Sequence, residues 1–430
     1  MRKLTVKNFS VIKEAELEFG KITVLIGPQA SGKSLLCKLA YFLSKEALDF
    51  AVETILGGKS FGEFKALFIG RFLSRFSNAQ REEPYVIELT EGDFSVRFSG
   101  KYETYDGEIK CNFSERFSTL YSQLVRDYSP VGRVGESSIQ NTQVMIWTQL
   151  SLLLDDDFAL RSTYIPVGRA FFTNVSLGFS ALQNPDIDPL TRQFSSEISW
   201  TAQWQGFALT HGDSALIDVN NQMREIAGGA VNGASDSPVF ISRDGRTLPL
   251  TLLSSGTQEL LPLLNVLSRL AFIVQTTAYT IPEKHRETPG RAMIRSKNIV
   301  YVEEPETSIF PSTQFELVRL FGRLSHEPTL DFRWVITTHS PYILTAFNNL
   351  IEAGQAVRNN PSIHDKVAEI IPEQYWIKEG DFKAYAIEDG VLKSIVAKDT
   401  GLVSANYLDQ VSETIGTEFD ELLRLGYVES

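Results

Sequence analysis

Three short runs of apolar residues recur along the chain, at 22–26, 300–302 and 334–336. Runs of this length without a polar break are typical of strands that are buried on both faces of a parallel sheet. Residues 34–43, directly after the first run, have the apolar spacing of a helix. This order of strands and helix predicts an α/β fold with a mostly parallel sheet.

Between the first and second runs, the pattern predicts an antiparallel β-subdomain and a helical lobe. Residues 46–82 have a mostly helical pattern with a break at Gly57-Gly58, and residues 84–112 alternate in the manner of paired strands. Residues 113–160 return to a helical pattern. The stretch 173–237 is mixed and is predicted to be a helical lobe, punctuated by turn residues.

The remaining stretches are shorter. An Asp-Gly pair inside 239–246 predicts a hairpin, and residues 280–297, which are polar and contain Pro282 and Pro289, predict a loop. Residues 373–396 predict a further hairpin. Residues 404–425 predict an amphipathic helix for core or partner packing, whose apolar face carries Leu408, Val411, Ile415 and Phe419.

The first apolar run leads into a phosphate-binding loop. Residues 27–34 fit the pattern G-x-x-x-x-G-K-[ST], in the sequence Gly27, Pro28, Gln29, Ala30, Ser31, Gly32, Lys33 and Ser34. A loop between a buried strand and a helix start directs several backbone N–H groups at one point, which suits a phosphate. Lys33 is predicted to reach the β- and γ-phosphates, and the Ser34 hydroxyl to bind Mg²⁺.

The other two apolar runs also end in polar residues. Because ligands collect at the carboxyl ends of parallel strands, Glu303 and Glu304 are expected near the phosphates. Glu303 is interpreted as the Mg²⁺ ligand and Glu304 as the base that orients the attacking water. His339 follows the third run and is predicted to contact the γ-phosphate, before Pro341 begins a helix.

A fourth motif stands between the phosphate loop and the acidic strand. Ser254, Ser255 and Gly256 precede a stretch with helical spacing. Taken alone, they favour an ordinary helix cap. Their place between the phosphate loop and the acidic strand gives the string a second interpretation.

These four motifs, in this order, resemble those of ABC-type ATPases, in the soluble branch that includes SMC, RecF and OLD-type proteins. The opening residues 4–9 and 15–19 are similar to the first hairpin of that branch, and Glu303 stands where Asp is usual. In the family, Leu-Ser-x-Gly is the signature motif. The resemblance implies that Ser254, Ser255 and Gly256 bind the γ-phosphate held by a second copy, and that Arg169 lies near the nucleotide.

The resemblance implies an ABC-type P-loop NTPase core, with ATP and Mg²⁺ as cofactors. An antiparallel β-subdomain, a helical lobe and a small C-terminal α/β extension would complete the fold. The predicted divisions are a first core half with the β-subdomain at 1–112, a mainly helical insert at 113–237, a second core half at 238–365, and a C-terminal hairpin and helix at 366–430.

Composition limits the partners. The net charge of −12 gives no global basic surface for nucleic acid, but it does not exclude a local basic groove. Arg71, Arg75 and Arg81 share a helical stretch that is interpreted first as a solvated helix edge. The chain has two cysteines, no apolar run of membrane-spanning length and no signal-peptide pattern, so a cytoplasmic protein without membrane contact is expected.

The leading functional hypothesis is an ATPase that switches between two states as ATP is bound and split. It would form a homo-oligomer, which is at least a dimer. Assembly into a larger ring is an alternative that the sequence does not decide. The residues after Pro341 contain no Asp-x-Asp, so a separate effector protein is expected, as in the anti-phage defence systems of this family. Two alternatives remain open: a RecF-like or SMC-like ATPase that acts on DNA directly, and a nucleotide-gated scaffold with little turnover.

Overall fold

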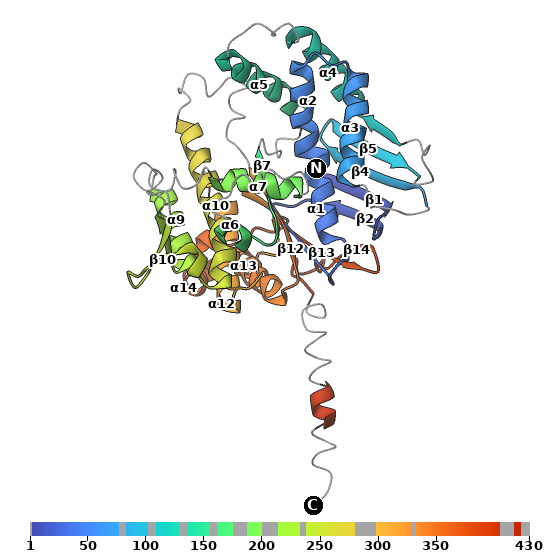
Figure 1. Ribbon diagram of the computed structural model, residues 1–430. Coiled ribbons are helices and arrows are strands. Elements are labelled where there is room, and N and C mark those ends of the chain that lie inside the picture. The colour runs from blue at the N-terminus through green and yellow to red at the C-terminus, as the bar shows by residue number, and fades with distance from the viewer. Residues whose placement is uncertain are drawn as a thin grey trace, which may run out of the picture.

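The computed structural model describes residues 2–76, 83–101, 109–128, 136–154, 161–174, 187–199, 214–232, 238–279, 298–327, 330, 332–404 and 417–422. Within these residues, an α/β fold is built on one large mixed sheet with helices on both faces (Figure 1). The α/β prediction is confirmed. Among the described helices, none is long and apolar enough to cross a membrane.

The large sheet has a parallel part and an antiparallel part. Its strand order is β6-β5-β4-β1-β2-β14-β13-β3-β12-β11-β7. The parallel part contains β3 (Ile22–Ile26), β7 (Arg161–Ile165), β11 (Asn298–Glu303), β12 (Phe332–Thr338) and β13 (Phe382–Glu388). The antiparallel part contains β1 (Lys3–Phe9), β2 (Ile12–Glu18), β4 (Tyr85–Glu91), β5 (Phe94–Gly100) and β6 (Lys110–Phe113).

Two strands of the sheet occupy places that sequence periodicity did not predict. The C-terminal hairpin of β13 and β14 (Val391–Ser394) was predicted, but β13 lies beside β3, in register from Phe382↔Ile22 to Ala386↔Ile26. Strand β7 lies inside the stretch 113–237, which was expected to be mainly helical, and it pairs with β11 at the sheet edge. The predicted domain boundaries themselves stay a prediction.

Helices on one face of the sheet follow the phosphate loop. Helix α1 (Lys33–Tyr41) continues through a π-helical turn (Phe42–Glu46) into α2 (Ala47–Leu56), and α3 (Phe61–Arg75) follows the predicted glycine break. Helices α4 (Glu115–Tyr128) and α5 (Glu136–Ser151) complete this layer, which packs on the antiparallel strands through a phenylalanine-rich core.

The opposite face carries α6 (Ala170–Asn174), α9 (Ser214–Ala227), α10 (Ser255–Tyr279), α12 (Pro311–His326), α13 (Pro341–Asn359) and α14 (His364–Ile370). Helix α7 (Pro189–Ser199) contributes Leu190 to the core on the α1 side and Phe194 to the other core. Beside them, β8 (Gly229–Asn232), β9 (Val239–Ser242) and β10 (Thr247–Pro249) form a small antiparallel sheet that contains the predicted hairpin.

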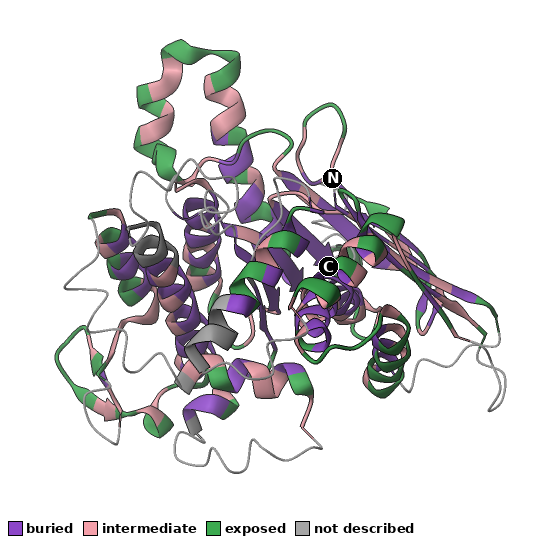
Figure 2. Cartoon of the chain, turned by 90° about the horizontal axis from the view of Figure 1, so that it is seen from above, coloured by how far each residue is buried: buried purple, intermediate pink, exposed green. Residues whose placement is uncertain are grey.

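Side chains of each central strand alternate between two cores. Leu25, Tyr301 and Val335 face the α1 layer, whereas Val24 and Val302 face the layer of α10, α12 and α13. Because both faces are covered, the strand sequences are nearly continuous apolar runs. Figure 2 shows the result, with buried strands in the interior and exposed residues on the outer helices.

Two predicted segments are described in part or not at all. The predicted loop 280–297 lies outside the described residues, as do Leu408, Val411 and Ile415 of the predicted C-terminal helix. Residues 417–422 are helical, and the side chain of Phe419 is 59% exposed. Phe419 is therefore not a core residue of the chain, and packing of this face against a partner stays a prediction.

Candidate functional site

The predicted phosphate loop joins β3 to α1, and its backbone suits an anion. Gly32 stands at the N-cap of α1 with φ 106°. No side chain caps this helix start, so its first N–H groups can donate to an anion. This φ favours glycine, and a Cβ on Gly32 would also lie 2.5 Å from Cδ1 of Ile12, which would have to move. The Ser31 hydroxyl is buried without a hydrogen-bond partner. These features fit a bound phosphate.

Lys33 lies inside this loop. Its side chain is buried, and Nζ donates to the carbonyls of Gly27 and Pro28, each at 2.8 Å. Burial lowers the pKa of the Lys33 ammonium, while the charges of Glu304 and Glu306 act in the opposite direction. The structure therefore brings Lys33 into the electrostatic field of the acidic turn after β11, as the sequence predicted.

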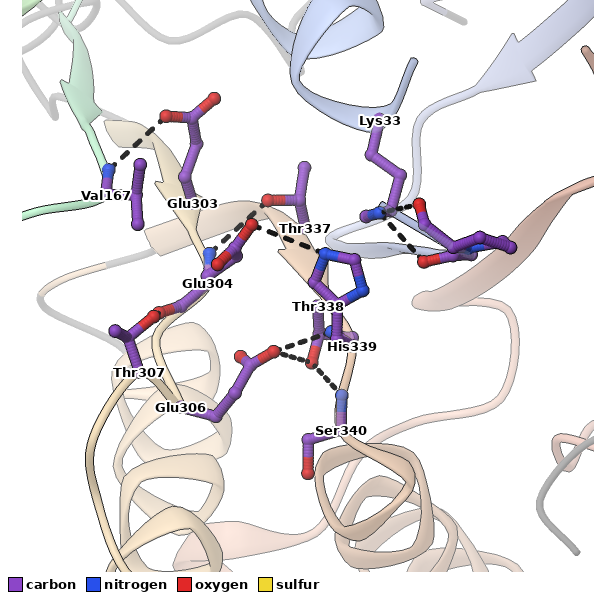
Figure 3. Close-up of polar contacts among 12 residues, drawn as sticks. Lys33, Val167, Glu303, Glu304, Glu306, Thr307, Thr337, Thr338, His339 and Ser340 are labelled. Atoms are coloured by element: carbon purple, nitrogen blue, oxygen red, sulfur yellow. Dashed lines mark hydrogen bonds and ion pairs between the residues drawn. The ribbon is translucent and has the colours of Figure 1, made fainter. Parts of the chain in front are cut away.

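Glu303 is the last residue of β11, and both of its carboxylate oxygens accept hydrogen bonds. The Tyr164 hydroxyl donates to Oε1 at 2.7 Å. The Val167 backbone N–H donates to Oε2 at 3.3 Å (Figure 3). Burial, followed by the charge of Glu303, raises the pKa of Tyr164 well above its usual range, so the phenol remains a donor. Sequence reasoning assigned no role to Tyr164.

Glu304 and His339 meet at the ends of neighbouring strands. Oε1 of Glu304 lies 3.4 Å from Nε2 of His339, and both side chains are about one third exposed. Glu304 has φ 42°, an uncommon conformation for a residue with a side chain. It is held by its N–H, which donates to the Thr337 carbonyl at 2.9 Å. Backbone strain of this kind is typical of functional positions.

Glu306 ties the acidic turn to the histidine strand. Its Oε1 accepts from the Thr338 hydroxyl at 2.8 Å and from the His339 backbone N–H at 2.6 Å, while its Oε2 is buried without a hydrogen-bond partner (Figure 3). Burial raises the pKa of Glu306. Sequence reasoning missed this residue, although the string Glu-Glu-Pro-Glu contains it.

The predicted signature residues form the start of α10. Ser254 is exposed, and its hydroxyl lies 2.9 Å from that of Thr257 and accepts from the Thr257 N–H at 3.4 Å. This is the helix-cap geometry that the sequence also allowed. A Cβ on Gly256 would lie 2.6 Å from the Ser308 carbonyl oxygen, so the helix start packs directly on the loop after Glu304.

Arg169 lies against the acidic turn, and its expected place near the nucleotide stays a prediction. Its side chain is 1% exposed, and each of its three nitrogens donates to a backbone carbonyl: Nε to Glu259, Nη1 to Pro166 and Glu303, and Nη2 to Glu304. The guanidinium is engaged in holding the backbone of the site. We therefore interpret Arg169 as a residue that positions the acidic turn and not as a ligand of the nucleotide.

The candidate basic stretch of α3 does not form a groove of unpaired charge. Arg71 pairs with Glu53 at 2.9 Å, and Arg75 forms two hydrogen bonds to Glu46, at 2.7 and 2.9 Å. Arg81 lies outside the described residues. The two described arginines are thus paired with glutamates that precede them in the chain. This pairing favours the interpretation of the stretch as a solvated helix edge.

Comparison with known proteins identifies the segment that carries most of this site. The family model of the AAA ATPase domain matches residues 184–344. This stretch includes Ser254 and Gly256, the acidic turn at Glu304, and His339. Residues 184–344 are therefore similar to an AAA ATPase domain. This match supports the predicted ATPase, and the ABC type stays a prediction.

Solved structures that the comparison finds have low similarity to this chain. An SMC head bound to the C-terminal winged-helix domain of ScpA has 13% identity to it, with a TM-score of 0.40 over 91% of this chain and 96% of that chain. The SMC head domain from Thermotoga maritima has 13% identity and a TM-score of 0.36 over 91% and 97%. The recombination mediator RecF has 12% identity and a TM-score of 0.33 over 91% and 97%. No curated protein matches the chain.

Proposed function

We propose that this chain is a Mg²⁺-dependent ATP hydrolase that works as a nucleotide-controlled switch between separated and paired copies. The observation that carries the proposal is the Glu304–His339 pair, whose atoms lie 3.4 Å apart beside the phosphate loop of Lys33. A carboxylate there can orient and deprotonate a water, and the imidazole can donate to a phosphate oxygen.

The residues of the phosphate loop fit ATP. The uncapped start of α1 and the buried Ser31 hydroxyl would receive phosphate oxygens, and Lys33 would exchange its two carbonyl partners for them. Ser34 and Glu303 would hold Mg²⁺, which neutralises charge on the phosphates when bound. Tyr164 and the Val167 N–H keep the Glu303 carboxylate in one orientation.

Ser254, Ser255 and Gly256 are proposed to act on the nucleotide of a second copy. Among the described contacts, the Ser254 side chain bonds to Thr257 of its own helix, and Lys33 bonds to its own loop. Large apolar side chains next to the site motifs are exposed: Leu252 (72%), Phe310 (75%) and Tyr342 (58%). Exposed apolar side chains of this kind suit a protein interface, and a head-to-tail dimer would place each signature on the partner's nucleotide.

The wider role follows from the resemblance to the OLD-like branch. ATP would hold two copies together, and loss of the γ-phosphate would loosen them, because ATP favours only the paired state. We propose that this change controls a separate effector protein in bacterial anti-phage defence. Assemblies larger than the dimer, and direct action on DNA, are the alternatives.

The second copy is tested by mixing two inactive variants. Lys33→Ala removes the phosphate lysine, and Ser254→Arg places a large charged side chain at the exposed start of α10 without entering the loop after Glu304. Each variant alone is expected to lose ATP hydrolysis. An equal mixture is expected to recover about one quarter of the wild-type rate, because half of the dimers are mixed and each has one intact site.

The control is each variant alone at the same total protein concentration, which is expected to stay inactive. Particle mass, measured with and without ATP, is expected to show that wild-type copies pair when ATP is bound. A mixture that stays inactive, or monomers that hydrolyse ATP as fast as paired copies, would contradict the composite site.

Tyr164→Phe is expected to weaken Mg²⁺ binding. The variant loses the 2.7 Å hydrogen bond to Glu303 and keeps the ring. Changes to residues that orient a metal ligand weaken metal affinity by about 10- to 100-fold. Mn²⁺ binding, measured by electron paramagnetic resonance with a non-hydrolysable ATP analogue, gives the affinity directly. Tyr385→Phe is the matched control, since that hydroxyl donates to the Glu18 carbonyl at 3.1 Å. Equal Mn²⁺ affinity in the two variants would refute the role of Tyr164.

A further inference from the structure

Arg169 joins two parts of the ATPase that serve different nucleotides in a dimer. One part is the acidic turn: Nη1 donates to the Glu303 carbonyl at 2.7 Å and Nη2 to the Glu304 carbonyl at 3.0 Å. These are the backbone carbonyls of the proposed metal ligand and the proposed base. Because Glu304 has a strained φ of 42°, its carbonyl direction depends on such external contacts.

The other part is the first turns of the signature helix α10. Oε2 of Glu259 accepts from the Arg169 backbone N–H at 3.0 Å and lies 3.5 Å from Nε, and Nε also donates to the Glu259 carbonyl at 3.2 Å. Both residues are buried, with exposed fractions of 1% for Arg169 and 6% for Glu259. A buried pair of this kind is held by its geometry, because separating the charges without water is costly.

A second contact ties the same two parts together. Gly256 packs so closely on the loop after Glu304 that a Cβ would lie 2.6 Å from the Ser308 carbonyl. The helix start therefore rests on this loop at one point and is bound through Arg169 to the acidic turn at another. A shift of the acidic turn has to move the signature helix or break the Arg169 hydrogen bonds.

We propose that Arg169, paired with Glu259, is a positioning residue that couples the two nucleotide sites of the dimer. This inference rests on the proposed function, in which the acidic turn of one copy acts on its own nucleotide and its signature acts on the partner's. Arg169 then transmits the state of one copy's acidic turn to the site on the other copy. A lysine cannot replace it, because one ammonium cannot span carbonyls in the planar directions of the guanidinium.

Mixed dimers with one live site separate this coupling from a local effect. The first copy carries Glu304→Gln and supplies an intact signature. The second carries Ser254→Arg, a change of an exposed side chain, and keeps the intact phosphate loop and base. Neither copy is active alone, so all hydrolysis comes from mixed dimers. Arg169→Lys is then added to the first copy, where it can reach the live site only through the signature helix.

The expected result is a fall of about tenfold in kcat with an unchanged KM for ATP, since the phosphate loop of the live site is wild type. Glu259→Gln in the first copy should have the same effect, and the double variant should fall no further than the larger single effect. Arg358→Lys in the first copy is the matched control, because Arg358 forms an exposed ion pair with Glu379. Thermal unfolding verifies that each variant is folded, and Glu259→Gln tests the coupling if Arg169→Lys does not fold.

The coupling would be overturned if Arg169→Lys or Glu259→Gln left kcat unchanged in the first copy and lowered it in the second copy. Arg169 would then have only a local role. An inactive mixture of the two parent copies would instead refute the dimeric site itself, and the coupling with it.

Discussion

Glu304→Gln is expected to lower ATP turnover by at least about 100-fold, because a positioned general base contributes about 10²- to 10⁴-fold to such reactions. The substitution keeps the size of the side chain and removes its ability to take a proton. Phosphate release under saturating ATP measures the effect. The affinity for ATP is expected to be unchanged, since Glu304 lies beside His339 and not in the phosphate loop.

The same variant is expected to accumulate in the paired state when ATP is added, because ATP is bound and not split. Particle mass with and without ATP reports this state. Glu352→Gln, a change of an exposed carboxylate on α13, is the matched control and should behave as the wild type. Turnover of Glu304→Gln at the control rate would eliminate Glu304 as the base and move the search to Glu306.

Lys33→Ala is expected to raise the Kd for ATP by at least about 30-fold, since removing one partner of a buried charge pair costs about 2–5 kcal/mol. Lys33 is 5% exposed, so its ammonium would meet the phosphates with little water between them. Titration with a fluorescent ATP analogue measures the affinity. The exposed Lys398→Ala is the matched control for the loss of one positive charge.

Two results would decide the interpretation of Lys33. An unchanged Kd in a folded Lys33→Ala variant would show that the loop does not hold the triphosphate through this lysine. A variant that binds ATP weakly and also unfolds at a lower temperature would point to the two carbonyls of Gly27 and Pro28, which lose their donor. Comparing the thermal unfolding of the two lysine variants without nucleotide separates these cases.

Much of the site could be predicted because its motifs are local in sequence. A phosphate loop needs a strand, glycines that allow unusual torsions and a helix start, and all of these fall within 22–43. Glu304 and His339 were placed near each other from one rule, that parallel strands end at the same sheet edge. The strands β11 and β12 are neighbours in register from Asn298↔Phe332 to Glu303↔Thr337, so the rule holds here.

Contacts across long stretches of chain could not be predicted in the same way. Tyr164 and Glu303 are separated by 139 residues, and their hydrogen bond exists because β7 pairs with β11. The resemblance implied that Arg169 lies near the nucleotide, but the backbone carbonyls that its guanidinium contacts have no sequence signal. Burial of a charged side chain depends on its neighbours in space, which periodicity along one segment does not report.

By itself, the sequence predicted the chemistry that we propose. The phosphate loop, the acidic turn and the histidine follow from a few adjacent positions, and the signature follows from its place between the loop and the acidic strand. The tertiary structure alone decided how these motifs are connected. It placed β13 beside the phosphate-loop strand, gave Glu303 its tyrosine donor, and bound the signature helix to the acidic turn through Arg169 and Glu259. The physical reason is that hydrogen bonds and buried charges are satisfied by whichever groups the packed fold brings within reach.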